Sequence, residues 1–228
     1  MKTTESIKIN NHMLEGGFIL STIDELLHTL PTTAVSDALA GTTNMNAIIK
    51  PLKDEYHIAG RALTVRLPIG ENGALLEAIR ISQPGAILVV DAKGDTNRAV
   101  AGDFVVSLMK GMDIHGLVVD GVIRDIQAIR DLDFPVFCIG TTVAAGNKFG
   151  GGVIQVPVAV GGISVQPGDY IVGDADGVVV IPQDQVEEVI EKAKNKMAKD
   201  EKRALSVAGG KEQIIAYLDQ TLGYEKLK

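Results

Sequence analysis

Residues 115–125 read HGLVVDGVIRD and combine a strand pattern, a turn and a pair of charged side chains. Leu117–Val119 is a short apolar run, which is typical of a buried strand. Asp120-Gly121 follows it and is a turn signal. Arg124-Asp125 therefore lies just past a strand end, where loops on a rigid scaffold commonly carry functional side chains.

On either side of this stretch, strand and helix patterns alternate through the first half of the chain. Strands dominate the second half before two closing helices. This order predicts a mixed α/β fold. The glycine-rich segment 140–152 is predicted to be a loop, long enough to be functional. A first helix begins near Ser21 and ends at Pro31. The other predicted helices are 34–40, 74–81, 98–110 with a fresh start at Gly102-Asp103, 126–130, 183–206 and 212–222; the predicted strands are 57–68, 86–91, 117–119, 136–139, 153–160, 163–165, 170–172 and 178–181.

The bulk composition favours one α/β domain over residues 21–228 behind an N-terminal arm, residues 1–20. A net charge of −7 argues against a nucleic-acid-binding protein, and the absence of tryptophan leaves few stacking platforms. No apolar stretch approaches the length of a membrane span, and no hydrophobic segment follows the polar start, so we expect a cytoplasmic protein that binds no membrane. Cys138 lies in an apolar run and reads as a buried small hydrophobe rather than a nucleophile.

Asp103 is the second acidic residue of interest, and twenty residues separate it from the Arg124-Asp125 pair. A helix that starts at Gly102-Asp103 would expose the amides of Phe104 and Val105, and such amides form an anion site with the positive end of the helix dipole. Carboxylates are hard oxygen ligands for a divalent cation, and a guanidinium clamps a substrate carboxylate. Each residue alone has a plainer interpretation, since either aspartate could cap a helix and Arg124 could be a surface residue.

The Gly102-Asp103 and Arg124-Asp125 spacing resembles the signature of class II pyruvate aldolases of the 4-hydroxy-4-methyl-2-oxoglutarate aldolase family. These belong to the superfamily of the ribonuclease activity regulator RraA. The resemblance covers roughly residues 20–210 and implies a layered αββα sandwich similar to phosphohistidine swivelling domains. Other segments that agree are 33–39, 60–66, 89–91, 94–95, 119–121, 140–142, 160–162 and 167–180.

The resemblance implies roles for the residues of this signature. Asp125 would be the direct ligand of Mg²⁺ or Mn²⁺, and Asp103 would hold a metal-bound water. Arg124 would grip the substrate and stabilise the enolate, while Gly102, Phe104 and Val105 would receive the pyruvyl carboxylate. The implied reaction is retro-aldol cleavage of 4-hydroxy-2-oxo acids to pyruvate and a second oxo acid, with oxaloacetate decarboxylation as a side activity.

Four further positions match the family less specifically. Glu71 and Asn72 lie in a loop that lines the family's site, Lys148 could bind the distal carboxylate of the substrate, and Glu201 could be contributed across a subunit boundary. The plain interpretations are a solvated loop for Glu71 and Asn72, an exposed loop residue for Lys148, and a solvated helix face with ion pairs for Glu201. The family's trimers, sometimes paired into hexamers, make a homotrimer or hexamer the expected assembly.

Two alternatives remain open. A Schiff-base aldolase would need a desolvated lysine, and Lys148 is the residue to examine. The second alternative is a non-catalytic RraA-like regulator that binds a ribonuclease or another protein partner. In the regulator pattern, however, the residue after the arginine is not a carboxylate. The four histidines show no metal-ligand spacing and are interpreted as incidental.

Overall fold

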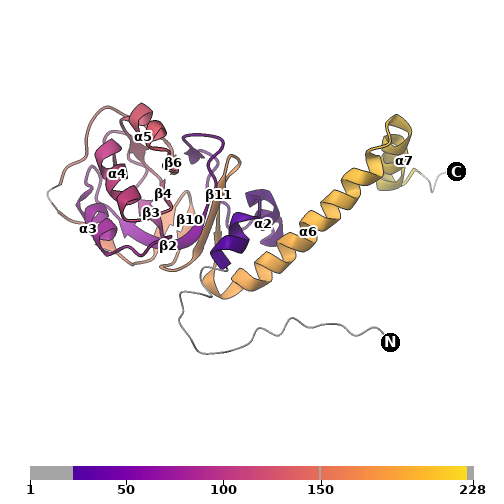
Figure 1. Cartoon of the computed structure of the whole chain (residues 1–228), viewed down its shortest axis with the longest axis horizontal. Coiled ribbons are helices and arrows are strands. Elements are labelled where there is room, and N and C mark those ends of the chain that lie inside the picture. Colours follow the sequence, from indigo (N-terminus) through magenta and orange to yellow (C-terminus); the bar gives the residue numbers. More distant parts are fainter. Residues whose placement is uncertain (1–22, 149, 225–228) are drawn as a thin grey trace.

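The computed structural model describes residues 23–148 and 150–224, so the predicted arm, residues 1–20, lies outside the described part (Figure 1). Residues 23–28 are helical, and Pro31 separates them from the next helix as predicted. The remaining helices are α2 (Thr32–Ala38), α3 (Gly73–Ile81), α4 (Asp103–Gly111), α5 (Ile126–Leu132), α6 (Val186–Val207), preceded by the 3₁₀ turn η1 (Gln183–Gln185), and α7 (Lys211–Leu222).

The central sheet has the order β1-β6-β4-β3-β2-β11-β12, with β8 paired to β2. Its middle strands β2 (Ile58–Arg66), β3 (Ile87–Asp91), β4 (Gly116–Val119) and β6 (Val136–Cys138) run parallel. Antiparallel strands flank them: β1 (Lys50–Pro51), β8 (Val153–Ile154), β11 (Tyr170–Asp174) and β12 (Gly177–Ile181). This mixed sheet with helices confirms the α/β prediction, while the finer likeness to swivelling domains stays a prediction.

Alternate residues of the buried strands face opposite sides of the sheet. On β3, Leu88 and Val90 join the cluster under α3, α4 and α5, whereas Ile87 and Val89 join the cluster on the other face. That other face is covered by the antiparallel pair β9 (Val158–Val160) and β10 (Ile163–Val165). Because both faces are buried, the parallel strands are continuous apolar runs, as the sequence indicated.

A third cluster joins the helical segment 23–28, α2 and the first half of α6 to strands β11 and β12. Beyond Ala193, α6 extends away from the sheet and carries α7 at its far end (Figure 1). None of the described helices is long and apolar enough to cross a membrane.

Two predicted elements differ from the structure. The helix expected over 98–110 begins only at Asp103, because residues 98–102 follow an extended course along the neighbouring loops. The strand expected over 153–160 is split into β8 and β9, since Gln155 adopts a left-handed backbone with φ of 54°.

Candidate active site

Backbone hydrogen bonds bring the two halves of the signature together. The Val100 amide donates to the Val122 carbonyl at 2.8 Å, and the Arg124 amide donates to the Ala101 carbonyl at 3.0 Å. The short strand β5 (Val122–Ile123) also pairs in parallel with β7 (Gly140–Thr141). Residues 100–103, 122–125 and 140–142 therefore meet at one edge of the molecule.

Asp125 stands at the N-cap position of α5 but makes no side-chain capping hydrogen bond. Its backbone is left-handed, with φ of 58° and ψ of 37°, whereas an N-cap residue normally has extended dihedrals. Its Oδ2 lies 3.3 Å from Arg124 Nε, and both side chains are partly exposed. Asp125 is therefore the N-cap residue by position, as the plain interpretation had it, but its side chain does not cap the helix and its carboxylate is turned toward Arg124.

Asp103 opens α4, with Gly102 as the N-cap residue. Asp103 Oδ1 accepts a hydrogen bond from the Phe104 amide at 2.7 Å. Of the two amides expected to bind a substrate carboxylate, the one on Phe104 is thus engaged. Within the described residues, the Val105 amide has no acceptor, and it points out of the positive end of the helix.

Two adjoining hollows share Asp103 and Arg124. The outer hollow is open, has a volume of about 820 Å³ and is lined by Asp103, Arg124, Asp125, Ile126–Ala128 and Thr141–Val143. The inner cavity has a volume of about 130 Å³ and is lined by Asn72, Ala99, Ala101–Val105, Arg124, Ala145, Gly146 and Lys148. The two aspartates and the arginine of the signature therefore border the same outer hollow, although they come from separate segments of the chain.

Of the four positions that match the family less specifically, Asn72 and Lys148 line the inner cavity, whereas Glu71 and Glu201 line neither hollow. Asn72 is buried, donates from Nδ2 to the Val100 carbonyl at 3.2 Å, and keeps a buried Oδ1 with no partner among the described residues. Lys148 is exposed at the rim, which does not favour the desolvated lysine of a Schiff-base enzyme. Glu71 pairs through its backbone with Asn147, and Glu201 lies on the projecting part of α6.

Thr141–Val143 line the outer hollow, and Ala145 and Gly146 line the inner cavity, but none of them was named as a site residue from the sequence. Their signals were the glycine-rich loop and the Gly140-Thr141-Thr142 segment. The loop is fixed over the site by backbone hydrogen bonds from Ala99 to Ala144, at 2.8 Å, and from Gly146 to Ala99, at 3.0 Å. Sequence spacing carries no information on such pairing, which depends on how distant segments meet.

The family model RraA-like: Aldolase/RraA matches residues 32–180, more than half of the chain. The chain belongs to the RraA-like aldolase family. A relative from Halalkalibacterium halodurans, named "Putative 4-hydroxy-4-methyl-2-oxoglutarate aldolase", is 50% identical over 194 residues, which are 85% of this chain and 92% of the relative. An uncharacterized protein of Methanocaldococcus jannaschii is 36% identical over 72% of this chain and 79% of its own length.

Solved structures agree with the RraA-like fold. An uncharacterized protein from Pseudomonas syringae superposes with a TM-score of 0.76 at 26% identity, covering 86% of this chain and 97% of that one. Streptomyces coelicolor RraAS2, described as an unusual member of the RNase ES inhibitor RraA family, gives a TM-score of 0.75 at 28% identity, covering 82% and 98%. The fold thus hosts proteins with different described functions, so function must be argued from the site.

The carboxylates of this RraA-like protein fit a water-rich magnesium or manganese site. In the described part of the chain, no three His, Cys, Asp or Glu side chains are arranged to hold a metal ion. Mg²⁺ needs fewer protein ligands, because it keeps several waters and is commonly held by one or two carboxylates. Asp125 and Asp103 each have one carboxylate oxygen without a partner among the described residues, so they match that donor set.

Asp120 lies in the turn before Arg124, and its pKa is raised above the ordinary value of a carboxyl group. Burial is the main cause that raises its pKa to about 6, and the nearby charge of Asp91 adds to it. The Ala92 amide donates to Asp120 Oδ1 at 2.7 Å and acts in the opposite direction. Asp91 is itself buried and paired with Lys93 Nζ at 2.6 Å. The ends of β3 and β4 thus hold a carboxyl pair, neither member of which lines the outer hollow or the inner cavity.

Asp120→Asn is expected to remove a pH dependence of folding stability. The folded pKa, about 6, lies above the ordinary value of 3.8, so the folded state binds more protons between these values and stability falls as pH rises through them. The variant keeps the acceptor for Ala92 and should be more stable than the natural protein at pH 8 by on the order of 1 kcal/mol, allowing for the partial exposure of the group. Urea unfolding at pH 5 and pH 8 measures this, and equal pH dependence in both proteins would contradict it.

Three of the histidines lie together, although their sequence spacing gives no sign of it. His28 Nδ1 and His57 Nδ1 are 3.2 Å apart, and the rings of His28 and His115 are 6.4 Å apart. Burial, followed by the neighbouring His57 and His115, lowers the pKa of His28. They line neither the outer hollow nor the inner cavity. Cys138 is buried as predicted, and burial raises the pKa of its thiol.

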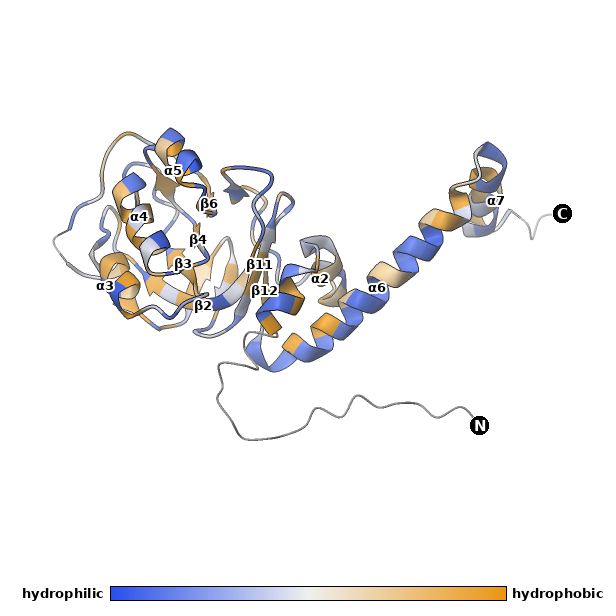
Figure 2. Cartoon of the chain, in the orientation of Figure 1, coloured by the Kyte–Doolittle hydropathy of each residue, from blue (hydrophilic) through white to orange (hydrophobic). Residues whose placement is uncertain are grey.

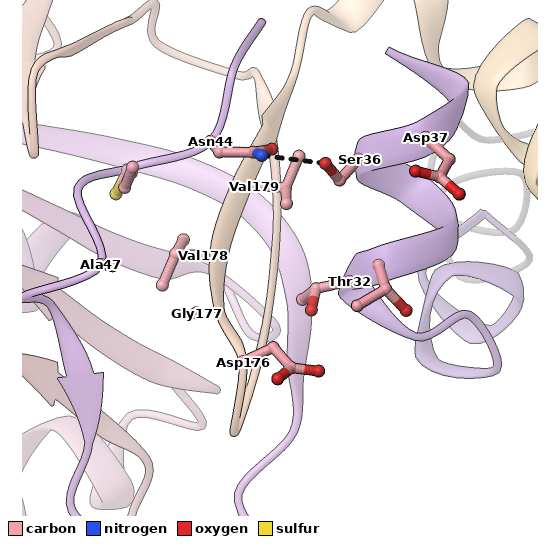
Figure 3. A pocket seen from close by; sticks show the side chains of 11 residues that line it. Thr32, Ser36, Asp37, Asn44, Ala47, Asp176, Gly177, Val178 and Val179 are labelled. Carbon is pink, nitrogen blue, oxygen red and sulfur yellow. Dashed lines mark hydrogen bonds between the residues drawn. The ribbon is translucent and has the colours of Figure 1, made fainter. Parts of the chain in front are cut away.

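A separate hollow of about 260 Å³ lies between α2 and the β11–β12 hairpin (Figure 3). Its polar side chains are hydroxyls, an amide and two carboxylates, and the Asn44 amide donates to Ser36 Oγ at 2.9 Å. Because Asp37 and Asp176 line it and no cationic side chain does, it does not suit an anionic oxo acid. The site around Arg124 remains the candidate for such a substrate.

Proposed function

We propose that this chain is a divalent-metal-dependent carbon–carbon lyase that cleaves 4-hydroxy-2-oxo acids, such as 4-hydroxy-4-methyl-2-oxoglutarate, to pyruvate and a second oxo acid. The observation that carries the proposal is the placement of Asp103, Arg124 and Asp125 around one space at the start of α4. The name of the Halalkalibacterium halodurans relative supports the aldolase reaction.

Asp125 would hold Mg²⁺ or Mn²⁺ directly, and Asp103 would act on it through water. A bound ion of this kind supplies a Lewis acid for the 2-keto group of the substrate. Asp103 would orient a water that relays the proton of the substrate 4-hydroxyl to Asp103 Oδ2, which has no partner among the described residues. Both carboxylates border the outer hollow, so a substrate can reach them from solvent.

Arg124 has the central role in charge stabilisation. Its Nε faces Asp125, which leaves the terminal guanidinium nitrogens for the keto and carboxylate oxygens of the substrate. The Val105 amide at the start of α4 would receive the pyruvyl carboxylate, helped by the helix dipole. Breaking the C3–C4 bond leaves negative charge on the enolate oxygen of pyruvate, and a fixed guanidinium favours that charge. Decarboxylation of oxaloacetate forms the same enolate, so it is the expected side activity.

The inner cavity, which Val105 also lines, would accept the distal part of the substrate on its Asn72 and Lys148 side. Lys148 at its rim can pair with a second carboxylate, and the unpartnered Oδ1 of Asn72 can accept a hydrogen bond from a hydroxyl group. A buried acceptor without a partner costs free energy in the free enzyme, so a substrate donor gains affinity by satisfying it.

We also propose that the protein assembles as a homotrimer or hexamer through its C-terminal arm, defined as α6 from Met197 onward together with α7. Apolar residues recur along the arm, and Leu205 and Leu222 are 67% and 60% exposed (Figure 2). No residue of α7 is buried within the single chain. Such a surface is typical of an interface. In an assembly, the arm could carry Glu201 to the site of another subunit.

Leu218→Asp on α7 is expected to reduce the oligomeric mass, because a charge would have to be buried in the proposed interface. Gln220→Asp is the matched control, since it adds the same charge to an exposed position outside the apolar set. Size-exclusion chromatography with light scattering measures both. A natural protein that is monomeric, or a Leu218→Asp variant with unchanged mass, would refute this interface.

The proposed reaction predicts metal-dependent pyruvate release. A panel of 4-hydroxy-2-oxo acids and oxaloacetate, with lactate dehydrogenase reporting pyruvate, should give turnover that EDTA abolishes and Mg²⁺ or Mn²⁺ restores. Turnover that survives exhaustive chelation would refute the metal requirement. An inert protein that also binds no Mn²⁺ would favour the regulator alternative instead.

A further inference from the structure

We propose that Gly102 is a positioning residue whose missing side chain reserves the space in which the Asp125 carboxylate and the Arg124 guanidinium rest. The inference rests on the proposed function, because it concerns how the ligand of the metal is aimed. A Cβ at residue 102 would stand closer than 3.0 Å to Asp125 Oδ2, and at 3.1 and 3.2 Å from Arg124 Nε and Cγ. Real Cβ atoms essentially never make the first of these contacts, so the two side chains would have to move.

The glycine is not required by the backbone of residue 102. Its φ of −130° and ψ of −173° are extended, a conformation that any residue adopts. Nor does Gly102 serve as a flexible hinge, because its carbonyl accepts from the Val106 amide at 3.0 Å and fixes the first turn of α4. Close approach by Asp125 and Arg124 is therefore what the absence of a side chain permits.

The backbone of Asp125 contributes the other half of the arrangement. Three aspartates in the described chain are left-handed, with φ of 53° at Asp113, 58° at Asp125 and 52° at Asp133. Asp113 and Asp133 follow the ends of α4 and α5, where left-handed residues are common. Asp125 instead precedes a helix, where this conformation is unusual and gives up a capping bond. Its strained backbone turns the carboxylate into the space beside Gly102, and a conformation of that kind persists only when its surroundings hold it.

A methyl group at residue 102 should therefore weaken metal binding without disturbing α4. Gly102→Ala adds the Cβ but is a poor N-cap, so Gly102→Ser is the second variant, because serine is a good N-cap and adds the same Cβ. Gly111→Ala is the matched control, since Gly111 ends the same helix and a Cβ there would meet nothing within 4 Å. Thermal unfolding should show Gly102→Ser and Gly111→Ala to be folded.

The test measures the dissociation constant of Mn²⁺ by electron paramagnetic resonance on the full chain. We expect at least about tenfold weaker binding in both Gly102 variants and no change in Gly111→Ala, the effect typical of disturbing a group that orients a ligand. In an Asp125→Ala background, Gly102→Ala should add no further loss, because the two changes act on one ligand. Mn²⁺ affinity in both Gly102 variants equal to that of the natural protein would overturn the inference.

A second measurement separates this inference from the proposed function. A metal-free crystal structure of Gly102→Ser should place Asp125 Oδ2 and Arg124 Nε away from their present 3.3 Å arrangement. Unmoved side chains would overturn the positioning role whatever the protein binds. A natural protein that binds no Mn²⁺, together with displaced side chains in Gly102→Ser, would refute the metal-dependent function and leave the positioning role in place.

Discussion

Asp125→Asn is expected to lower kcat/KM for pyruvate release by about 10²- to 10³-fold, the loss seen when one preorganised electrostatic group is removed from an active site. The amide keeps the size of the side chain and, like aspartate, tolerates the left-handed backbone with φ of 58°. It removes the charge that would hold the metal ion, so added Mn²⁺ should restore little activity. Steady-state kinetics over a range of Mn²⁺ concentrations measure the loss.

Asp113→Asn is the matched control for this change. Asp113 is also exposed and left-handed, with φ of 53°, but it lies in the turn after α4, at the opposite end of that helix from the site. The same chemical change there should leave kcat/KM within about twofold of the natural value, because exposed substitutions away from special features have small effects. A near-normal rate for Asp125→Asn would rule out this residue as the ligand.

The fold could be predicted in outline because its main strands are buried on both faces. Runs such as Ile87–Asp91 are continuous in apolar character, and the turn residues around them mark their ends. The exceptions are segments where tertiary pairing overrides the local pattern. Residues 98–102 have a helical pattern but are held by backbone hydrogen bonds to residues 122 and 144, so the helix starts later.

The candidate site was predictable to the extent that its residues are adjacent in sequence. Gly102-Asp103 and Arg124-Asp125 could each be placed at a helix start or a strand end, and the hydrogen bond from Arg124 to Ala101 joins them. The reach of Asn72 into the inner cavity, by contrast, depends on the Asn72 amide donating to the Asn147 carbonyl at 2.9 Å. A contact between segments about 75 residues apart follows from the topology of the sheet, and a single sequence does not encode it in any local pattern.

The position of Glu201 has a different explanation. On the single chain it lies on the projecting part of α6, remote from α4 (Figure 1). A role for it in the site requires another copy of the chain, and sequence patterns in one chain do not report contacts between copies. The exposed apolar residues of the C-terminal arm are the physical indication of such contacts.

Arg124→Lys is expected to lower kcat/KM by about 10²-fold for both retro-aldol cleavage and oxaloacetate decarboxylation. Lysine keeps the positive charge but loses the planar fork, in which Nε faces Asp125 while the terminal nitrogens remain for the substrate. Because both reactions form the same pyruvate enolate, the two losses should be equal. Arg80→Lys is the control, since Arg80 is an exposed arginine on α3 that also pairs with a carboxylate, that of Glu77. Lys148→Ala should instead lower kcat/KM only for substrates that carry a distal carboxylate. If Arg124→Lys also lowered kcat/KM only for those substrates, the guanidinium would bind the distal carboxylate and not the reacting keto group.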